Sequence, residues 1–493
     1  MSRLRRRTRS ARLTAPLAVA ALLAGGGCVW AATGASAEAA SGSADAQDDF
    51  NGDGYADLVV GAPEATFSGQ EHAGYVAVMY GSADGLSASR KEIISRSTSG
   101  IPGSATADQY FGSTFAKGDL NGDGYAELVI AGGREGSVIL WGSASGLTGG
   151  TDIPTYGAAP QIGDFDGDDT PDLALFSHRY ASSDGGEGGP ATLWKGPIAR
   201  EGIPTKVLNI VDESGWWGWE EHDPSCADGS GCEDGPDSIT GPIRSGQVGD
   251  INGDGKDDIV QQSFIGDGMW GNRVLYGGTS GFTYKRAPGD TTGEVGTGVG
   301  DVNGDGYDDV VTGEDGYAKA YVALGSASGL KDDDLQSLDQ DLPGFPGTQE
   351  DGDRLGSSVS VEDVTGDGYA DVALGIPGED VGNTADTGSI ALLHGSASGV
   401  TGTGAQVFHQ NTAGVPGTAE KGDCFGRSTA LLDVNGDDHR DLATGSVVEN
   451  EENGAAWLLR GTKKGLTSSS AFAFGPDDIS APFKDAHFGS PLD

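Results

Sequence analysis

Seven short stretches of the sequence carry oxygen-bearing side chains at a fixed spacing. The first, residues 49–57, reads Asp-Phe-Asn-Gly-Asp-Gly-Tyr-Ala-Asp, and all seven have oxygen side chains at positions 1, 3, 5 and 9. Several oxygen ligands on one short, sharply turning loop suit a hard divalent cation such as Ca²⁺. Position 4 is glycine in every copy, which lets the loop close tightly around an ion. The pattern predicts up to seven calcium sites.

The predicted ligands are the four oxygen side chains of each copy and the backbone carbonyl of position 7, where the side chain varies. They are Asp49, Asn51, Asp53, Tyr55 and Asp57 in the first copy; Asp119, Asn121, Asp123, Tyr125 and Glu127 in the second; Asp164, Asp166, Asp168, Thr170 and Asp172 in the third; Asp250, Asn252, Asp254, Lys256 and Asp258 in the fourth; Asp301, Asn303, Asp305, Tyr307 and Asp309 in the fifth; Asp363, Thr365, Asp367, Tyr369 and Asp371 in the sixth; and Asp433, Asn435, Asp437, His439 and Asp441 in the seventh.

The start of each copy also looks like an EF-hand, but the rest of the copy argues against one. An EF-hand needs a bidentate Glu at position 12 and a helix on each side of the loop. No copy has an acidic residue at position 12: the residues there are Val60, Ile130, Leu175, Gln261, Thr312, Leu374 and Thr444. An apolar, β-branched run follows position 9 in the first copy, so we expect each loop to join two strands.

The first 37 residues read as a secretory signal peptide. Six arginines precede an apolar run at 17–24, and Ala35-Ser36-Ala37 is a small-residue cleavage site. The arginine cluster also resembles a twin-arginine export signal. No other stretch is long and apolar enough to span a membrane. We therefore expect residues 38–493 to be secreted as an extracellular domain.

Strong negative charge limits the possible partners. Removing residues 1–37 takes away six of the 30 basic residues and none of the 74 acidic ones, which leaves a formal charge of −50. A chain this acidic repels nucleic acids and anionic membranes. Neither is therefore an expected partner. Many of the carboxylates are predicted calcium ligands, and bound ions would offset part of the charge.

Around each loop the sequence repeats the same order of strands and turns. An opening strand leads into the loop, a second strand ends in a turn such as Gly61-Ala62-Pro63, and a third strand follows. A second turn, residues 81–86 in the first unit, then leads to an outer strand. Seven such units predict an all-β fold, a seven-bladed β-propeller with four-stranded antiparallel blades.

The first unit lacks an opening strand, and the end of the chain offers one. Residues 488–490 read Phe-Gly-Ser, as residues 111–113 do at the start of the second unit. We expect residues 487–493 to pair beside residues 58–61, which would close the ring and cover strand edges that are otherwise exposed.

The Phe-Gly and Gly-Ala-Pro groups that flank these loops resemble FG-GAP repeats, the blades of the integrin α-subunit head. Bacterial secreted proteins with FG-GAP or VCBS-type repeats are also similar. The resemblance covers residues 42–493 and implies calcium in the loops on one face of the propeller, with other proteins meeting the opposite face and rim. Three loops depart from the pattern, at Glu127, Thr365 and Asp438, and we expect weaker binding there.

One insertion, at about 200–243 in the third unit, interrupts the regular spacing. It holds Trp216, Trp217 and Trp219, which would form a platform for a carbohydrate or peptide or else anchor the insertion on its own blade. Cys226 and Cys232 are close enough in sequence to form a disulfide in an oxidising compartment.

These observations favour a secreted, monomeric calcium-binding propeller that acts as a binding or adhesion module for protein or glycan ligands. The alternative is an extracellular hydrolase or lyase that acts on polysaccharide or phosphodiester substrates. The sequence has no Gly-x-Ser-x-Gly or His-Glu-x-x-His motif, so the binding module is the preferred hypothesis. The fold alone does not name the ligand.

Overall fold

Short strands joined by Gly-rich turns make up almost all of the computed structural model. The structure describes residues 48–132, 136–153, 158–176, 178–182, 185–188, 191–209, 243–266, 269–288, 295–314, 318–331, 333 and 335–493. They belong to one unit of the chain, Ala40–Asp493. Within these residues the α-helical structure is limited to α1 (Glu449–Glu452), and no helix is long and apolar enough to cross a membrane.

Seven antiparallel sheets follow one another along the chain, and each is one blade. Their strands are β1 (Leu58–Ala62), β2 (Tyr75–Met79) and β3 (Lys91–Ile94) in blade one; β4 (Phe115–Gly118), β5 (Glu127–Ile130), β6 (Ser137–Trp141) and β7 (Thr148–Ile153) in blade two; β8 (Ala158–Gly163), β9 (Asp172–Phe176), β12 (Thr192–Lys195) and β13 (Lys206–Asn209) in blade three; β14 (Ile243–Gly249), β15 (Asp258–Gly266), β16 (Met269–Tyr276) and β17 (Thr283–Arg286) in blade four; β18 (Thr297–Gly300), β19 (Asp309–Glu314), β20 (Lys319–Ala323) and β21 (Gln336–Leu338) in blade five; β22 (Val359–Glu362), β23 (Asp371–Ile376), β24 (Ser389–His394) and β25 (Thr401–Phe408) in blade six; and β26 (Ser428–Leu432), β27 (Asp441–Ser446), β28 (Ala455–Arg460) and β29 (Thr467–Phe474) in blade seven.

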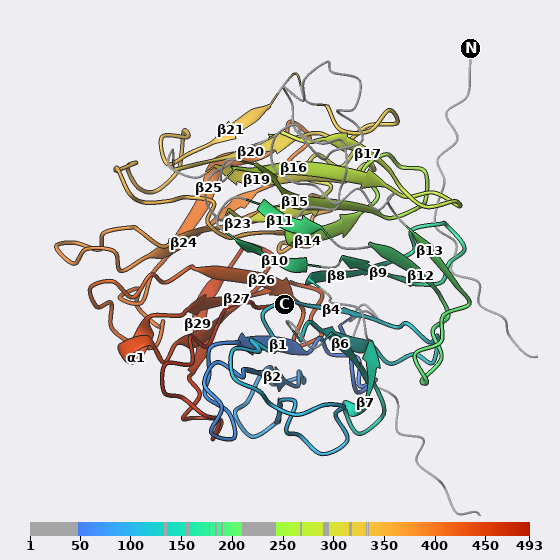
Figure 1. Cartoon of the computed structure of the whole chain (residues 1–493). Coiled ribbons are helices and arrows are strands. Elements are labelled where there is room, and N and C mark those ends of the chain that lie inside the picture. Colours follow the sequence, from blue (N-terminus) through green and yellow to red (C-terminus); the bar gives the residue numbers. More distant parts are fainter. Residues whose placement is uncertain are drawn as a thin grey trace, which may run out of the picture. The chain divides into compact units, whose positions relative to one another are not determined.

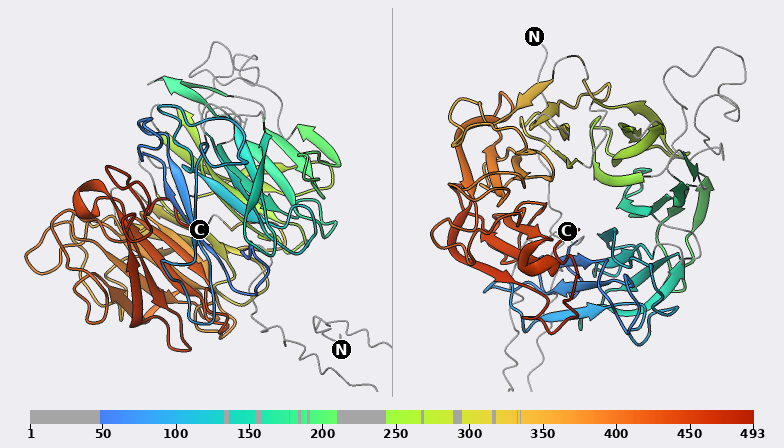
Figure 2. Two further views of the ribbon diagram at one scale, coloured as in Figure 1. Left: turned by 90° about the horizontal axis from the view of Figure 1, so that it is seen from below. Right: turned by 60° about the vertical axis from the view of Figure 1, so that its left-hand side comes forward.

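The first strands of blades two to seven line the centre of a ring. β4 contacts β8, β8 contacts β14, and the contacts continue through β18, β22 and β26. The ring brings blade seven back beside blade one, so that the two ends of the colour scale meet (Figures 1 and 2). The predicted seven-bladed β-propeller is confirmed.

The end of the chain completes blade one, as the repeat pattern predicts. Leu492 pairs antiparallel with Val60, the N–H of Val59 donates to the Asp493 carbonyl (2.7 Å), and the N–H of Gly61 donates to the Pro491 carbonyl (2.8 Å). These bonds give blade one its fourth, innermost strand.

A buried lysine joins both ends of the folded unit. The Lys117 side chain on β4 is 5% exposed, and its Nζ lies 2.9 Å from Asp48 Oδ1 and 3.1 Å from Asp493 Oδ1. Burial lowers the pKa of this ammonium group, but the two carboxylates outweigh that effect and raise the pKa above its ordinary value. The ion pairs therefore help to hold the closing strand against blade two.

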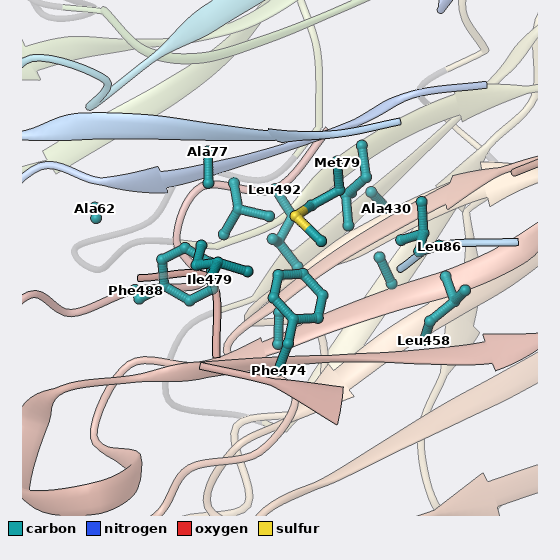
Figure 3. Packing of buried hydrophobic residues seen from close by; sticks show 14 of the residues in the cluster. Ala62, Ala77, Met79, Leu86, Ala430, Leu458, Phe474, Ile479, Phe488 and Leu492 are labelled. Atoms are coloured by element: carbon teal, nitrogen blue, oxygen red, sulfur yellow. The ribbon is translucent and has the colours of Figure 1, made fainter. Parts of the chain in front are cut away.

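Blades one and seven share one hydrophobic core at the closure. Phe488 packs edge-to-face on Phe474 with ring centroids 5.7 Å apart, and Leu492 and Met79 belong to the same buried cluster (Figure 3). Phe488 is fully buried although it lies five residues from the end of the chain. The closing segment is thus held by apolar packing as well as by hydrogen bonds.

At four blade junctions the glycine of the Gly-Ala-Pro group, or the glycine in its place, meets the glycine of the next blade's Phe-Gly group or its equivalent. The N–H of Gly375, from the second strand of blade six, donates to Ser358, and a Cβ added to Gly375 would overlap the carbonyl oxygen of Gly426 in blade seven. Gly313 and Gly445 approach the next blade in the same way. Glycine is required at these positions because the neighbouring backbone fills the space that a side chain would need.

Blade three differs from the other blades in two respects. A hairpin, β10 (His178–Ser182) and β11 (Gly185–Gly188), lies between its second and third strands along the chain. Its outer strand β13 pairs with β12, so residues 206–209 belong to the blade although the sequence placed them in the insertion. Residues 210–242, with Trp216, Trp217, Trp219, Cys226 and Cys232, lie outside the described residues.

Candidate metal centres

All seven acidic loops lie at the same end of the blades. In blades two to seven, each loop joins the innermost strand to the second strand, as residues 119–127 join β4 to β5. In blade one, residues 49–57 lead directly into β1. The structure therefore gathers every predicted ligand set on one face of the ring.

The carboxylate of position 1 organises each loop from within. In the first loop, Asp49 Oδ1 accepts the N–H of Gly52 at 2.6 Å and Asp49 Oδ2 accepts the N–H of Gly54 at 2.7 Å. Asp301 makes the equivalent bonds to Gly304 (2.7 Å) and Gly306 (2.8 Å). These bonds curl the backbone so that the side chains of positions 3 and 5 belong to the same tight turn.

The carboxylate of position 9 lies beneath the loop and is buried. Asp309 accepts the N–H of Val302 at position 2 (3.1 Å) and the N–H of Gly325 (2.8 Å), which begins the turn between the third and fourth strands. Asp57 contacts Phe50 and Gly81 in the same way. Position 9 thus connects the metal loop to a second turn of its own blade, a role that the spacing of the motif did not predict.

Burial also changes the acidity of position 9. Desolvation, opposed by the backbone hydrogen bonds and reinforced by the other carboxylates of the loop, raises the pKa of Glu127 to about 8. The same causes raise the pKa values of Asp172, Asp258 and Asp309 to about 7. A cation beside these groups would favour their charged form, so the loops are electrostatically suited to one.

The donor set fits calcium. Each loop offers carboxylate, amide or hydroxyl oxygens, and in the third loop one oxygen from each of Asp164, Asp166 and Asp168 lies within 4.8 Å of the others. Three buried loop oxygens, Asp166 Oδ1, Asp172 Oδ2 and Thr365 Oγ1, have no hydrogen-bond partner in the described part of the chain. Buried polar atoms without partners are uncommon, and an ion at the loop would satisfy them.

In two loops a lysine already contacts a ligand carboxylate. Lys195 Nζ, from β12, contacts Asp166 in the third loop, and Lys256 Nζ lies 2.7 Å from Asp254 in the fourth. The sequence predicted that Lys256, at position 7 of the fourth loop, would bind calcium only through its backbone carbonyl. An ammonium ion at these carboxylates competes with a metal ion for the same negative charge.

Neighbouring loops are hydrogen-bonded to one another. In blades one, two, four, five and six the N–H of position 8 donates to the position 1 carbonyl of the preceding blade, as Ala126 does to Asp49 (2.9 Å) and Ala370 to Asp301 (2.9 Å). Position 8 of blade three is Pro171, which has no N–H to donate. In blade five the position 8 side chain contributes as well, because Asp308 Oδ2 accepts the N–H of Asp250 at 2.8 Å. Burial raises the pKa of Asp308 to about 6.

The side chains of position 7 pack on the loop before them. A Cβ added to Gly304 would lie 2.7 Å from the Tyr369 ring, and one added to Gly253 would lie 2.6 Å from the Tyr307 ring. These glycines are at position 4, so glycine is needed there for the neighbouring blade as well as for the turn. The variation at position 7 concealed this contact in the sequence.

Family models and known proteins are similar to this chain in its repeats. A model of the FG-GAP repeat matches residues 41–79, 355–393 and 425–459, and a model of an FG-GAP-like repeat matches residues 119–175. Bovine phosphatidylinositol-glycan-specific phospholipase D is 33% identical over 30% of this chain, and integrin alpha-PS3 of Drosophila melanogaster is 32% identical over 26%. The chain spans only 17% and 13% of the lengths of these two relatives.

The fold is also similar to that of a lectin from Agrocybe aegerita, solved to describe its recognition of non-reducing terminal N-acetylglucosamine. The TM-score is 0.49 at 13% identity, over 91% of this chain and 95% of the lectin chain.

Proposed function

From the premise that this chain is an FG-GAP repeat protein with integrin-α-like blades, we propose that it is a secreted calcium-binding propeller. In this proposal it acts outside the cell as a binding or adhesion module for a protein or glycan ligand. FG-GAP proteins are typically extracellular, and residues 1–37 would serve as the signal peptide that directs export.

One observation carries the calcium part of the proposal: seven acidic loops lie on one face, and at most blade junctions a backbone hydrogen bond links neighbouring loops. Without cations, three or four carboxylates within nine residues repel one another. Calcium at positions 1, 3, 5, 7 and 9 would cancel this repulsion where the blades meet. The ions would then stabilise the ring, and the opposite face would be left for ligands.

The integrin relatives support the binding part of the proposal, because integrins are adhesion proteins. The matched regions are short compared with the relatives, so the ligands of those proteins are not carried over. Loops on a rigid scaffold carry function more often than the scaffold does, which directs attention to the face opposite the metal loops.

Arrays of extracellular proteins and glycans, probed with purified protein in calcium and in EGTA, test the proposal. We expect ligands that are retained in calcium and lost in EGTA. A protein that binds nothing on either array but cleaves polysaccharides or phosphodiesters would support the hydrolase or lyase alternative. A calcium-loaded protein with neither binding nor activity would contradict both.

A further inference from the structure

A cavity of about 490 Å³ lies in the ring at the end of the blades opposite the metal loops. Its lining residues include Glu64, just after β1, Ser113, just before β4, and Ser357, just before β22. Each of these strands has a metal loop at one end, and the lining residue lies at its other end. The volume is in the range of small-molecule sites in proteins.

Two buried polar groups of this cavity have no hydrogen-bond partner in the described structure. Gln262 on β15 and Thr297 at the start of β18 both line the cavity and are 1% and 5% exposed. Gln262 Nε2 and Thr297 Oγ1 are both unpartnered. A buried donor without a partner costs free energy, so a bound molecule that accepts these hydrogen bonds would gain from them.

Gln262 also breaks the repeat pattern. It is the fourth residue after position 9, the place that Gly61, Gly313 and Gly375 occupy in other blades. Those glycines lie against the backbone of the next blade. Phe176 takes this position in blade three and packs in a hydrophobic core, whereas in blade four a long amide side chain faces a cavity.

The chemistry of the lining favours a neutral ligand rich in hydroxyl groups. Ser113, Ser357 and Ser490 supply hydroxyls, and Gln247 supplies a second amide. Charge is sparse and nearly balanced: His487 Nδ1 lies 3.3 Å from Glu64 Oε2, and Arg427 is the remaining cation of the lining. An anionic ligand would have to enter a strongly acidic protein and would meet Glu64 in the lining.

We propose that this cavity binds one neutral saccharide unit, with Gln262 and Thr297 donating hydrogen bonds to its hydroxyl or ring oxygens. The inference rests on the proposed binding function and assigns it a site and a ligand class. The cavity also contains apolar surface, including Pro63 and Val359, against which the C–H face of a sugar ring would pack.

Saturation-transfer NMR with glucose, galactose, mannose, N-acetylglucosamine and cellobiose, on the calcium-loaded protein, tests the site. We expect at least one sugar to bind. Gln262→Met, which keeps the side-chain volume, and Thr297→Val, which keeps its shape, should each weaken binding about tenfold, since each removes one hydrogen bond from a buried group.

Gln261→Met is the matched control. Gln261 neighbours Gln262 on β15, is also 1% exposed and has an unpartnered amide, but it does not line the cavity. Its substitution should leave sugar affinity unchanged, and all three variants should melt like the unchanged protein. If none of the five sugars bound, the proposed site would be wrong. It would also be wrong if Gln262→Met and Thr297→Val bound sugar with the same affinity as the parent.

Failure of the site is distinguishable from failure of the proposed function. A protein that binds calcium-dependent ligands on the arrays but none of the five sugars would lose this cavity as its site and keep its function. Peptide or protein ligands whose binding is insensitive to Gln262→Met and Thr297→Val would give the same result.

Discussion

Positions 1 and 9 of each acidic motif have different roles in the structure, although the spacing alone predicts both as equivalent ligands. The carboxylate of position 1 holds the loop, whereas the carboxylate of position 9 is buried and also fixes a turn, as Asp57 fixes Gly81 24 residues further along the chain. The sequence predicted the oxygen set from short-range spacing. It did not predict the second partner of position 9, because that partner is brought there by the pairing of whole strands.

The lysine at the third loop was hidden for the same reason. Lys195 is on β12, far in sequence from Asp166, and the blade sheet brings the two together. Replacing this lysine by methionine removes the ammonium that competes for the loop. Calcium affinity at the third loop should then rise roughly threefold to tenfold, about 1 kcal/mol of ion-pair energy.

Calcium titration of Lys195→Met, followed by native mass spectrometry, measures this change. The exposed Lys206, on the next strand of the blade, gives the control Lys206→Met, which should leave the titration as it is. If the last calcium site to fill in Lys195→Met has the same affinity as in the parent, or a lower one, the lysine supports the loop rather than competing with calcium.

A carboxylate outside the metal loops should control the pH dependence of stability. Burial raises the pKa of Glu449 to about 7; the Gln410 hydrogen bond lowers it, and Asp423 and Glu420 raise it further. The folded protein therefore holds this proton more tightly than the unfolded chain. Its contribution is present at low pH and is lost as the pH rises from about 4.5 to about 7.

Melting curves of calcium-saturated protein between pH 5 and pH 8 would show this loss. Glu449→Gln keeps an acceptor for Gln410 and removes the titration, so its melting temperature should fall less over this range than that of the parent. The exposed neighbour Glu451, changed to Gln, should behave like the parent. Parallel profiles for Glu449→Gln and the parent would refute this assignment.

At the scale of elements, the Phe-Gly and Gly-Ala-Pro groups are two halves of one blade junction. The sequence showed both groups and their order along the chain, but their contact lies between different blades. Gly375→Ala places a Cβ against the Gly426 carbonyl, which is backbone and cannot move aside. We expect a loss of about 2 kcal/mol in the free energy of unfolding, the size usual for overpacking.

Denaturant unfolding of Gly375→Ala measures this loss, with Gly475→Ala as its control. A Cβ on Gly475 would have its nearest neighbour at 3.4 Å, the Gly454 carbonyl, and the backbone there does not need a positive φ. The control should change stability by less than about 0.5 kcal/mol. If the two substitutions lowered the free energy of unfolding equally, the close contact at the blade junction would not explain why glycine is found at position 375.

The closing strand could be predicted because Phe-Gly-Ser, which opens the second unit, is missing before the first unit and is found near the end of the chain. Its core contact could not be predicted in detail. Phe488→Ala empties a fully buried site beside Phe474 and should cost about 3–5 kcal/mol.

Phe483→Ala provides the comparison for the closing strand, since Phe483 lies four residues before that strand and is 46% exposed. Its loss should be within about 0.5 kcal/mol. Chemical denaturation of both variants separates the two cases. A Phe488→Ala protein as stable as Phe483→Ala would mean that the closing strand does not hold the ring.

At the scale of the whole molecule, the repeats predicted the blade number, the strand order and the closure, because each follows from a local pattern repeated seven times. The irregular sector was less predictable. Gln262 stands where four other blades have glycine, and its role depends on a cavity that forms only when the ring is complete. The insertion that holds Trp216, Trp217 and Trp219 stays a prediction, outside the described residues.

Calcium in loops linked across blade junctions should stabilise the ring. Two sites at 100 times their dissociation constants would contribute roughly 5 kcal/mol, so several sites acting together should dominate stability.

The direct measurement is the melting temperature of the purified protein in calcium and after exhaustive EGTA treatment, with metal content determined in both samples. We predict a fall of about 10 °C or more without metal, reversed when calcium is restored. The same melting curve for calcium-loaded and fully metal-free protein would contradict the account.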